Sequence, residues 1–218
     1  MQPDFWLQRW QNGQIGFHRS EVMPLLQKHW PTLELPPGSR VLVPLCGKTL
    51  DMHWLAAQGH RVLGIELSPM AIEQFFAEAG ITPQRHSSQY GEHYSAGPIE
   101  IICGDAFALD TELLADIAGV YDRAALIALP AHLRQHYRDT LYAQVPVGCQ
   151  GVLITLEYPQ DEKQGPPFSV EEDEVQRLFA TPWHASLLER RDIRDQQPDF
   201  NPEGISALST AVYRLQRL

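Results

Sequence analysis

With 218 residues, a mass of 24.7 kDa and 44% hydrophobic residues, the chain can form one domain with a sizeable core but not a second catalytic domain. A formal net charge of -10, from 17 Lys plus Arg against 27 Asp plus Glu, argues against nucleic acid or an anionic membrane surface as a partner. The three cysteines are widely spaced and no apolar run could cross a bilayer, so we expect reduced thiols in a cytoplasmic protein.

Residues 1–37 are rich in aromatic side chains and end at a Pro-Pro-Gly turn, which predicts an N-terminal cap on a single domain spanning 1–218. Beyond this cap, strand-like apolar runs alternate with helical patterns. Such alternation predicts an α/β fold with a mostly parallel sheet and helices on both faces, while the last two runs predict an antiparallel edge. The predicted strands are 41–45, 62–67, 99–103, 120–122, 152–156, 185–189 and 208–215, and the predicted helices are 50–58, 69–79, 131–144 and 170–179.

Two polar segments, 84–98 and 158–168, interrupt this pattern and contain several Gly, Pro and Ser residues. Their composition predicts loops. Loops of this length in a compact domain often act as lids or binding segments.

The most informative pattern lies at the first two predicted strands, where Gly47 closes the turn after one strand and Glu66 ends the next. A carboxylate about 20 residues after such a glycine can accept hydrogen bonds from both hydroxyls of a ribose. The alternative is an ordinary turn and a solvated strand end.

The glycines near Gly47 indicate which cofactor carries that ribose. The GxGxxG pattern that lets backbone approach a pyrophosphate is missing, and Leu42 stands where a triphosphate-binding loop has its first glycine. An adenosyl cofactor without phosphate remains. S-adenosylmethionine fits, because its sulfonium prefers carbonyl oxygens and aromatic faces to an anion-binding loop.

Other candidate site residues follow the predicted strands, because such sheets bind ligands beyond their carboxyl ends. Asp105 could accept a hydrogen bond from an adenine amino group or cap the short helix that follows it. Arg123 could hold an anionic acceptor or pair with the neighbouring Asp122. The further strand-end candidates are Leu45, Leu67 and Ala106.

The segment from Trp6 to His18 places Trp6, Trp10 and Phe17 close to two glycines. Core packing is the commoner role of such aromatics, although a segment of this kind could also fold over a sulfonium and exclude water. The nine histidines predict no metal site: a pair at i and i+4, His132 and His136, lacks a third ligand.

Taken together, these residues resemble the thiopurine S-methyltransferase family, and its bacterial members in particular. The resemblance implies a class I S-adenosylmethionine-dependent methyltransferase fold, Rossmann-like, with a mostly parallel seven-stranded sheet. It also implies methylation of aromatic and heterocyclic thiols, with selenium and tellurium compounds as further acceptors. The matching segments are 6–17, 43–48, 51–55, 64–68, 103–109, 122–126 and 165–168.

The resemblance also implies roles for individual residues. Phe17 and Arg123 would flank the acceptor, with Arg123 as the catalytic residue. Two departures from the family stand out: Asp105-Ala106 replaces the Ser-Ile of mammalian relatives, and Ala124 replaces the usual glycine. The implied cofactor-binding positions are Trp6, Trp10, Phe17, Leu45, Gly47, Glu66, Leu67, Asp105, Ala106 and Arg123.

Three other functions remain compatible with parts of the sequence. A small-molecule O- or N-methyltransferase would share the donor site, a nicotinamide-dependent reductase is disfavoured by the missing glycines, and a donor-binding sensor would retain Glu66 without catalysis. The sequence and the resemblance lead us to expect a monomer that acts on a small-molecule thiol, with no nucleic acid or membrane partner.

Overall fold

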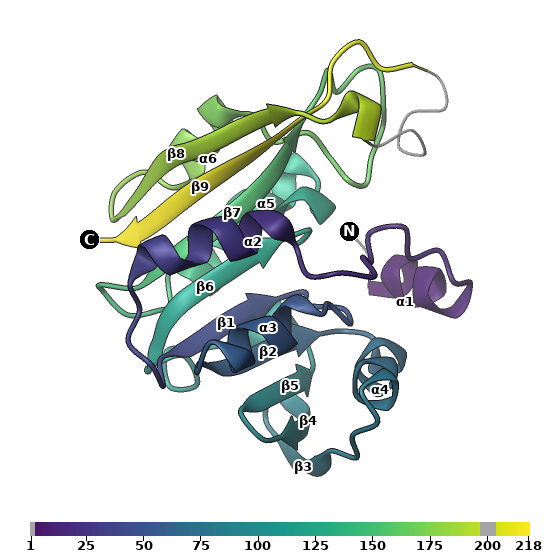
Figure 1. The fold of residues 1–218 in the computed structure, drawn as a ribbon, viewed down its shortest axis with the longest axis vertical. Coiled ribbons are helices and arrows are strands. Elements are labelled where there is room, and N and C mark those ends of the chain that lie inside the picture. The colour runs from purple at the N-terminus through teal and green to yellow at the C-terminus, as the bar shows by residue number, and fades with distance from the viewer. Residues whose placement is uncertain (1–2, 197–203) are drawn as a thin grey trace.

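One twisted sheet organises the computed structural model, which describes residues 3–196 and 204–218 (Figure 1). Within these residues the sheet has nine strands in the order β3-β4-β5-β2-β1-β6-β7-β9-β8. The five central strands run parallel, and both edges are antiparallel. The strands are β1 Arg40–Pro44, β2 Arg61–Glu66, β3 Gln84–Ser88, β4 Gly91–Ala96, β5 Ile99–Cys103, β6 Ile117–Arg123, β7 Gln150–Glu157, β8 Trp183–Asp192 and β9 Ser209–Arg217.

The prediction of seven strands with one antiparallel edge was wrong at residues 84–98, which form the hairpin of β3 and β4 instead of a loop. Every residue of β3 is exposed, so this strand has no apolar face and its sequence lacks the alternation that marks a half-buried strand. The strand is recognised only from its antiparallel hydrogen bonding with β4 in the structure.

Helices cover both faces of the sheet, as predicted (Figure 1). Successive side chains of β1 alternate between the two layers: Val41 and Val43 belong to the core cluster that includes residues of α2, α3 and α4, whereas Leu42 belongs to the cluster that includes residues of α5 and α6. The helices are α1 Pro3–Gln11, α2 Pro24–His29, α3 Asp51–Ala57, α4 Pro69–Glu78, α5 Ala131–Tyr137 and α6 Glu172–Leu178, with short 3₁₀ turns η1 Trp30–Leu33, η2 Ala106–Ala108, η3 Leu126–Ala128 and η5 Arg194–Gln196.

The predicted helix 131–144 changes its geometry halfway, because α5 ends at Tyr137 and the π-helical segment η4 Arg138–Tyr142 follows. A π turn brings residues five apart onto one side. The hydroxyls of Tyr137 and Tyr142 both donate to Oδ2 of the buried Asp122, at 2.9 and 2.8 Å. Satisfying this buried carboxylate from a single helical segment accounts for the local widening of the helix.

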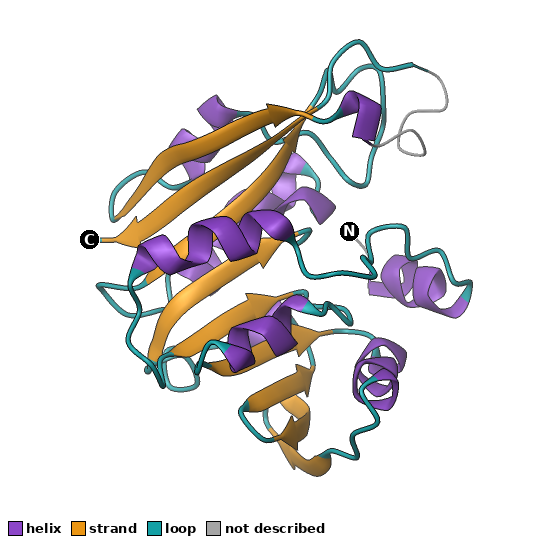
Figure 2. Cartoon of the chain, viewed as in Figure 1, coloured by secondary structure: helices purple, strands orange, loops and turns teal. Residues whose placement is uncertain are grey.

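The strand order reverses between β1 and β6, which lie side by side in the middle of the sheet. From β1 the parallel strands continue to β2 and β5, and from β6 they continue to β7. Crossovers that leave in opposite directions open a crevice at the carboxyl ends of the two strands. Figure 2 shows the arrowheads of the central strands pointing toward the side of the molecule where α1 lies.

Among the residues that the structure describes, no helix combines the length and the apolar character that a bilayer span requires.

Glu189 links the edge strand β8 to helix α2. Its carboxylate accepts a hydrogen bond from Lys28 Nζ at 2.8 Å, lies 2.6 Å from His29 Nε2 and also contacts Arg191. Burial opposes ionisation of Glu189, but these hydrogen bonds outweigh it and lower its pKa from 4.5 to about 2. A carboxyl group whose pKa falls on folding stabilises the native state above its unfolded pKa, and this contribution is lost as the pH drops toward 2.

We therefore expect Glu189→Gln to lower the free energy of unfolding at neutral pH by about 1 kcal/mol, a modest loss because the cationic partners are partly exposed. The difference from the native chain should shrink as the pH falls from 4.5 toward 2. Urea unfolding at a series of pH values measures both effects. Glu112→Gln, at an exposed position, is the control; an equal loss in both variants would contradict the assigned role of Glu189.

Candidate functional site

A cavity of about 1280 Å³ opens at the carboxyl ends of the central strands and is closed on one side by the N-terminal segment. Pockets for single small ligands usually measure about 300–1,000 Å³, so this cavity has room for two. All ten cofactor and substrate positions predicted from the sequence line it: Trp6, Trp10, Phe17, Leu45, Gly47, Glu66, Leu67, Asp105, Ala106 and Arg123. The structure thus brings together residues that are spread over more than half of the chain.

Glu66 lies at the end of β2 with its side chain buried against two turns. Its Oε2 accepts a hydrogen bond from Gly47 N at 2.8 Å, and its Oε1 accepts one from Ser68 N at 2.8 Å. Burial raises the pKa of Glu66, and the hydrogen bonds from the backbone of Ser68, Gly47 and Leu67 offset this shift in part. Each carboxylate oxygen can accept a second hydrogen bond, so the group is fixed in place and still able to bind a pair of hydroxyls.

The turn between β1 and α3 has an unusual backbone. Leu45 has a φ of 48°, which is rare for a residue with a side chain, and Gly47 has a φ of 53°. A Cβ on Gly47 would also lie 3.2 Å from an atom of the Trp10 ring. Glycine is therefore required at this position by its backbone conformation and by its close neighbour. Strained backbone of this kind is concentrated at binding sites.

Lys48, which follows this glycine, is tied to helix α4. Its Nζ donates to Glu78 Oε1 at 2.5 Å, and the side chain is largely buried. The ammonium group therefore already has a carboxylate partner within the fold. This pairing agrees with the sequence argument against a loop that binds a nucleoside triphosphate, in which the lysine reaches the phosphates.

Three aromatic rings of the N-terminal segment, those of Trp6, Trp10 and Phe17, line one side of the cavity and form what we call the aromatic wall. The ring of Phe17 lies edge-on to Trp10 and Trp6, with centroid separations of 5.6 and 5.8 Å, and Trp10 is 4% exposed. A hydrogen bond from Met23 N to Asp51 Oδ1, of 2.8 Å, fastens the end of this segment to α3. Trp10 is thus buried, Trp6 and Phe17 are half-buried, and all three line the cavity, whereas folding of the segment over a sulfonium stays a prediction.

Asp105 was predicted either to cap a helix or to contact adenine. Its Oδ1 accepts a hydrogen bond from Phe107 N at 2.9 Å, so it caps the 3₁₀ turn η2. The residue is exposed and also lines the cavity, and the contact with adenine stays a prediction.

Arg123 and Asp122 are neighbours in sequence but face different surroundings. Asp122 is buried, and besides the two tyrosine hydroxyls its Oδ1 accepts a hydrogen bond from Leu126 N at 3.1 Å. Pairing between the two residues, the alternative from the sequence, does not occur. Within residues 3–196 and 204–218, the guanidinium of Arg123 makes neither a hydrogen bond nor an ion pair, and the half-buried side chain lines the cavity. It is free to hold an anionic ligand through its planar donors.

His18 also lines the cavity, and the positive charges of Lys48 and Arg123 act on its imidazole. Burial lowers the pKa of His18, the charges of Lys48 and Arg123 lower it further, and Glu78 opposes them. A histidine whose pKa lies below its ordinary value of 6.5 is neutral at physiological pH, so its imidazole can accept a proton.

Thr155 is a cavity residue that sequence reasoning missed. Its hydroxyl oxygen is buried and has no hydrogen-bond partner among the described residues, although the residue lines the cavity. It lies on β7 just after Ile154, which is in register with Arg123 of β6. An orphan buried hydroxyl costs about 1–3 kcal/mol, so this group suits a polar atom of a ligand. The available signal was a lone polar residue at the carboxyl end of the apolar run 152–154.

Comparison with known proteins gives a consistent result. A family model described as Thiopurine S-methyltransferase (TPMT) matches residues 1–218. The chain is 68% identical over 217 residues to the thiopurine S-methyltransferase of Xanthomonas campestris pv. campestris (strain 8004), covering 100% of both chains. It is 59% identical over 218 residues to that of Nitrosomonas eutropha, covering 100% of this chain and 99% of the relative.

Among solved structures, a similar fold occurs in the 1,6-didemethyltoxoflavin-N1-methyltransferase of Burkholderia thailandensis, crystallised with 1,6-didemethyltoxoflavin and S-adenosylhomocysteine. The TM-score is 0.62 at 14% identity, and the match covers 98% of this chain and 87% of that one. At this level of identity the likeness concerns the fold alone.

Ala124, directly after Arg123, has a φ of 65°, a left-handed conformation that glycine adopts without strain. We therefore expect Ala124→Gly to raise the free energy of unfolding by about 0.5–1 kcal/mol, the relief of strain exceeding the entropy that glycine adds to the unfolded chain. Thermal melting measures the change. Ala77→Gly, on the exposed side of α4, should instead lower the melting temperature, and a loss in both variants would contradict the proposed strain.

Proposed function

The chain belongs to the thiopurine S-methyltransferase family and is an S-adenosylmethionine-dependent methyltransferase, and from this premise we propose that it methylates the sulfur of aromatic and heterocyclic thiols, thiopurines among them. The observation that carries the proposal is the guanidinium of Arg123, which has no partner in the described part of the chain and lies in the cavity that also contains the buried carboxylate of Glu66. One group suits an anionic acceptor and the other suits the ribose of the donor.

The donor half of the cavity fits an adenosyl sulfonium. Glu66 offers the remaining lone pairs of its fixed carboxylate to the ribose hydroxyls, and the rings of Trp10 and Phe17 provide apolar shielding for a cation. When bound, S-adenosylmethionine supplies an activated methyl group on a positively charged sulfur. We assign the remaining donor contacts to Trp6, Leu45, Gly47, Leu67, Asp105, Ala106 and Arg123.

In the acceptor half we assign binding to Phe17 and Arg123, with Arg123 as the catalytic residue. A thiolate held by the guanidinium would lie near the donor site, ready to form the new carbon–sulfur bond in line with the one that breaks. Holding the reacting atoms in line supplies much of the rate, and removing water favours a step in which opposite charges cancel. The hydroxyl of Thr155, which no described residue bonds, offers a further polar contact for a heterocyclic ring.

Proton transfer needs little assistance, since heteroaromatic thiols are already acidic. Where the acceptor arrives protonated, we propose that the neutral imidazole of His18 takes the proton. Its lowered pKa keeps it in the basic form at neutral pH, and the neighbouring charges of Lys48 and Arg123 help to cause that shift.

We further propose that residues 1–37 form a cap over the donor site within a single domain. The packing of Trp10 against the turn at Gly47 supports this arrangement, as does the hydrogen bond that ties Met23 to Asp51. A lid role for 158–168 also stays a prediction; the segment has no helix or strand, and Lys163, Pro166 and Pro167 line the cavity.

The same anion site leads us to extend the proposal to selenium and tellurium compounds. Selenolates and tellurolates are nucleophiles of the same kind as a thiolate and would bind the guanidinium of Arg123 in the same way. The size of the cavity, about 1280 Å³, sets no obstacle to a larger reacting atom.

Glu66→Gln tests the donor site. Losing a charge-assisted pair of hydrogen bonds should weaken binding of S-adenosylhomocysteine about 10-fold or more, as measured by calorimetry. Glu66→Asp, which keeps the charge but draws it back from the ribose, should also bind weakly. Glu73→Gln, an exposed position on α4, is the matched control and should bind normally. Native affinity in both Glu66 variants would remove this residue from the donor site.

The acceptor chemistry is tested with donor carrying a labelled methyl group and a panel of a thiopurine, an aromatic thiol, a phenol and an aromatic amine. We expect label to pass to the two thiols and not to the phenol or the amine. Transfer to oxygen or nitrogen without transfer to sulfur would contradict the proposal and favour a small-molecule O- or N-methyltransferase. Donor binding without transfer to any acceptor would indicate a sensor.

In the same assay, Arg123→Ala should lower kcat/KM for thiols about 10- to 100-fold, the loss expected for one hydrogen bond to a charged group. Arg123→Lys should recover part of the rate, because it keeps the charge but not the planar donors. Arg177→Ala, at an exposed position on α6, controls for removal of a positive charge. Unchanged kinetics in a folded Arg123→Ala variant would exclude this residue from the acceptor site.

A further inference from the structure

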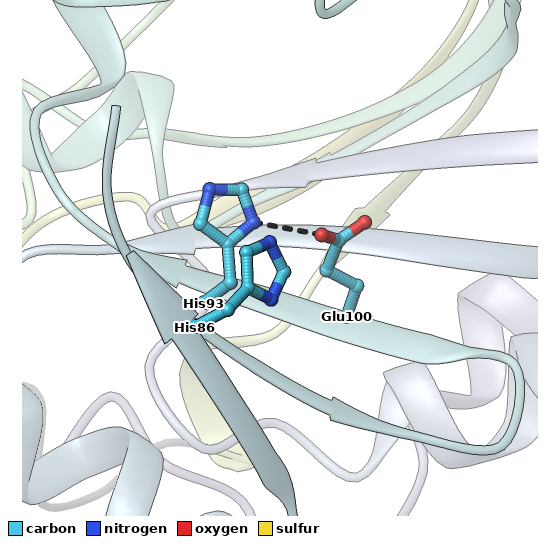
Figure 3. Close-up of side chains that lie close together, drawn as sticks. All are labelled: His86, His93 and Glu100. Carbon is cyan, nitrogen blue, oxygen red and sulfur yellow. Dashed lines mark hydrogen bonds and ion pairs between the residues drawn. The ribbon is translucent and has the colours of Figure 1, made fainter. Parts of the chain in front are cut away.

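Outside the cavity, three neighbouring strands bring two imidazoles and a carboxylate together (Figure 3). His86 of β3 is directly opposite His93 of β4, and His93 is opposite Ile102 of β5. Glu100 lies two residues before Ile102, so all three side chains project from the same face of the sheet. Each residue offers a ligand atom, and these atoms lie within 4.8 Å of one another.

We propose that His86, His93 and Glu100 bind a transition-metal ion, with Zn²⁺ as the best match. Two imidazole nitrogens and one carboxylate oxygen form a ligand set that Zn²⁺ accepts in tetrahedral geometry, with water in the fourth position. The ligands come from three strands and are seven residues apart along the chain, which explains why no motif in the sequence reveals them.

Binding of Zn²⁺ would require only a small change in the distances between the ligand atoms of these three residues. His93 Nδ1 lies 2.8 Å from Glu100 Oε1, a hydrogen-bond separation. Ligand atoms about 2.0 Å from a tetrahedral Zn²⁺ are about 3.3 Å apart. The ion would therefore replace the proton shared by His93 and Glu100, and the distance between their two ligand atoms would increase by about half an ångström. His86 stacks on His93 with centroids 4.3 Å apart and planes 25° apart, and because it is exposed its ring can turn to direct a nitrogen at the ion.

Neighbouring residues already orient two of the ligands. His93 Nε2 lies 2.6 Å from Ser88 Oγ, so a ring that binds metal through Nδ1 can donate its other N–H to this hydroxyl. Glu100 Oε2 accepts a hydrogen bond from Arg40 Nη2 at 3.0 Å, which leaves Oε1 to the ion. Such outer partners fix the tautomer of a histidine ligand and the direction of a carboxylate ligand.

The charges around the cluster permit a divalent cation. Arg40 is repulsive, but Asp116 Oδ1 accepts a hydrogen bond from Arg40 Nη1 at 2.9 Å and compensates part of its charge. Arg61 also donates to Asp116, at 2.9 Å, and is more exposed. The carboxylates of Glu100 and Asp116 offset the guanidinium groups of Arg40 and Arg61, so the immediate surroundings are not cationic.

The ion would have a structural effect. Strand β3 is exposed along its whole length and is held in the sheet by its pairing with β4. A ligand from each of β3, β4 and β5 would tie this edge to the parallel part of the sheet. Metal binding should therefore protect the backbone amides of β3 from hydrogen exchange, because an ion that binds the folded edge stabilises it.

Calorimetric titration of the full chain with zinc chloride, after removal of metal by a chelator, tests the proposal. We expect one Zn²⁺ per chain and a higher melting temperature with the ion present. His86→Ala and Glu100→Gln should each weaken binding about 10-fold or more, because each removes a ligand. His132→Ala, an exposed histidine that forms an i, i+4 pair with His136, is the matched control and should bind normally.

His86 is exposed, so the metal-free His86→Ala variant should melt with the native chain, which separates loss of a ligand from loss of the fold. Deuterium exchange should slow in β3 when Zn²⁺ is added to the native chain and not when it is added to His86→Ala. Native affinity in His86→Ala and Glu100→Gln, or loss of binding in His132→Ala, would overturn the assignment.

Discussion

The whole site depends on how one buried carboxylate is held. Glu66 is 7% exposed, and its two oxygens accept hydrogen bonds from the backbone of Gly47 and Ser68, each at 2.8 Å. A buried carboxylate is costly unless donors surround it, and here the donors come from the turn after β1 and from the start of α4. The side chain therefore fixes two neighbouring turns relative to each other. The geometry that would receive a ribose exists before any ligand binds.

The acceptor site that we propose depends on a second feature, the opposite orientation of two adjacent charged residues of β6. Side chains alternate along a strand, so Asp122 and Arg123 face opposite sides of the sheet. In the core, Asp122 accepts hydrogen bonds from the hydroxyls of Tyr137, at the end of α5, and Tyr142, at the end of the π-helical segment that follows. Because the acid is satisfied elsewhere, the guanidinium beside it needs no internal partner and stays available in the cavity.

The sequence predicts the parallel centre of the sheet well, because its strands are largely apolar on both faces and most of them are followed by a helix; the predicted strand 99–103 coincides with β5. It also places Glu66 and Arg123 at strand ends, where such folds bind ligands. It misses β3, whose residues are all exposed, and it misses the change of helix type at Tyr137. Both depend on contacts with distant segments.

The hydrogen-bond and ion-pair partners of individual side chains also depend on distant segments and cannot be predicted from the local sequence. No local pattern indicates that Lys48 pairs with Glu78, or that the Thr155 hydroxyl has no partner within residues 3–196 and 204–218, because strands and helices far apart in the chain decide both. Cross-strand register likewise brings His86 and His93 together across the hairpin of β3 and β4. The sequence shows which residue types are present. Whether each polar side chain has a hydrogen-bond or ion-pair partner depends on how the strands and helices pack.

Gly47 contacts two walls of the cavity that we propose as the donor site. Its N–H holds the carboxylate of Glu66, and the absence of a side chain lets the ring of Trp10 approach, since a Cβ would lie 3.2 Å from that ring. Any movement of this turn would therefore shift the carboxylate of Glu66 and the ring of Trp10 together. The N-terminal segment is thus packed directly on the turn that positions the acid, so the cap that we propose and the donor site that we propose share the same backbone atoms.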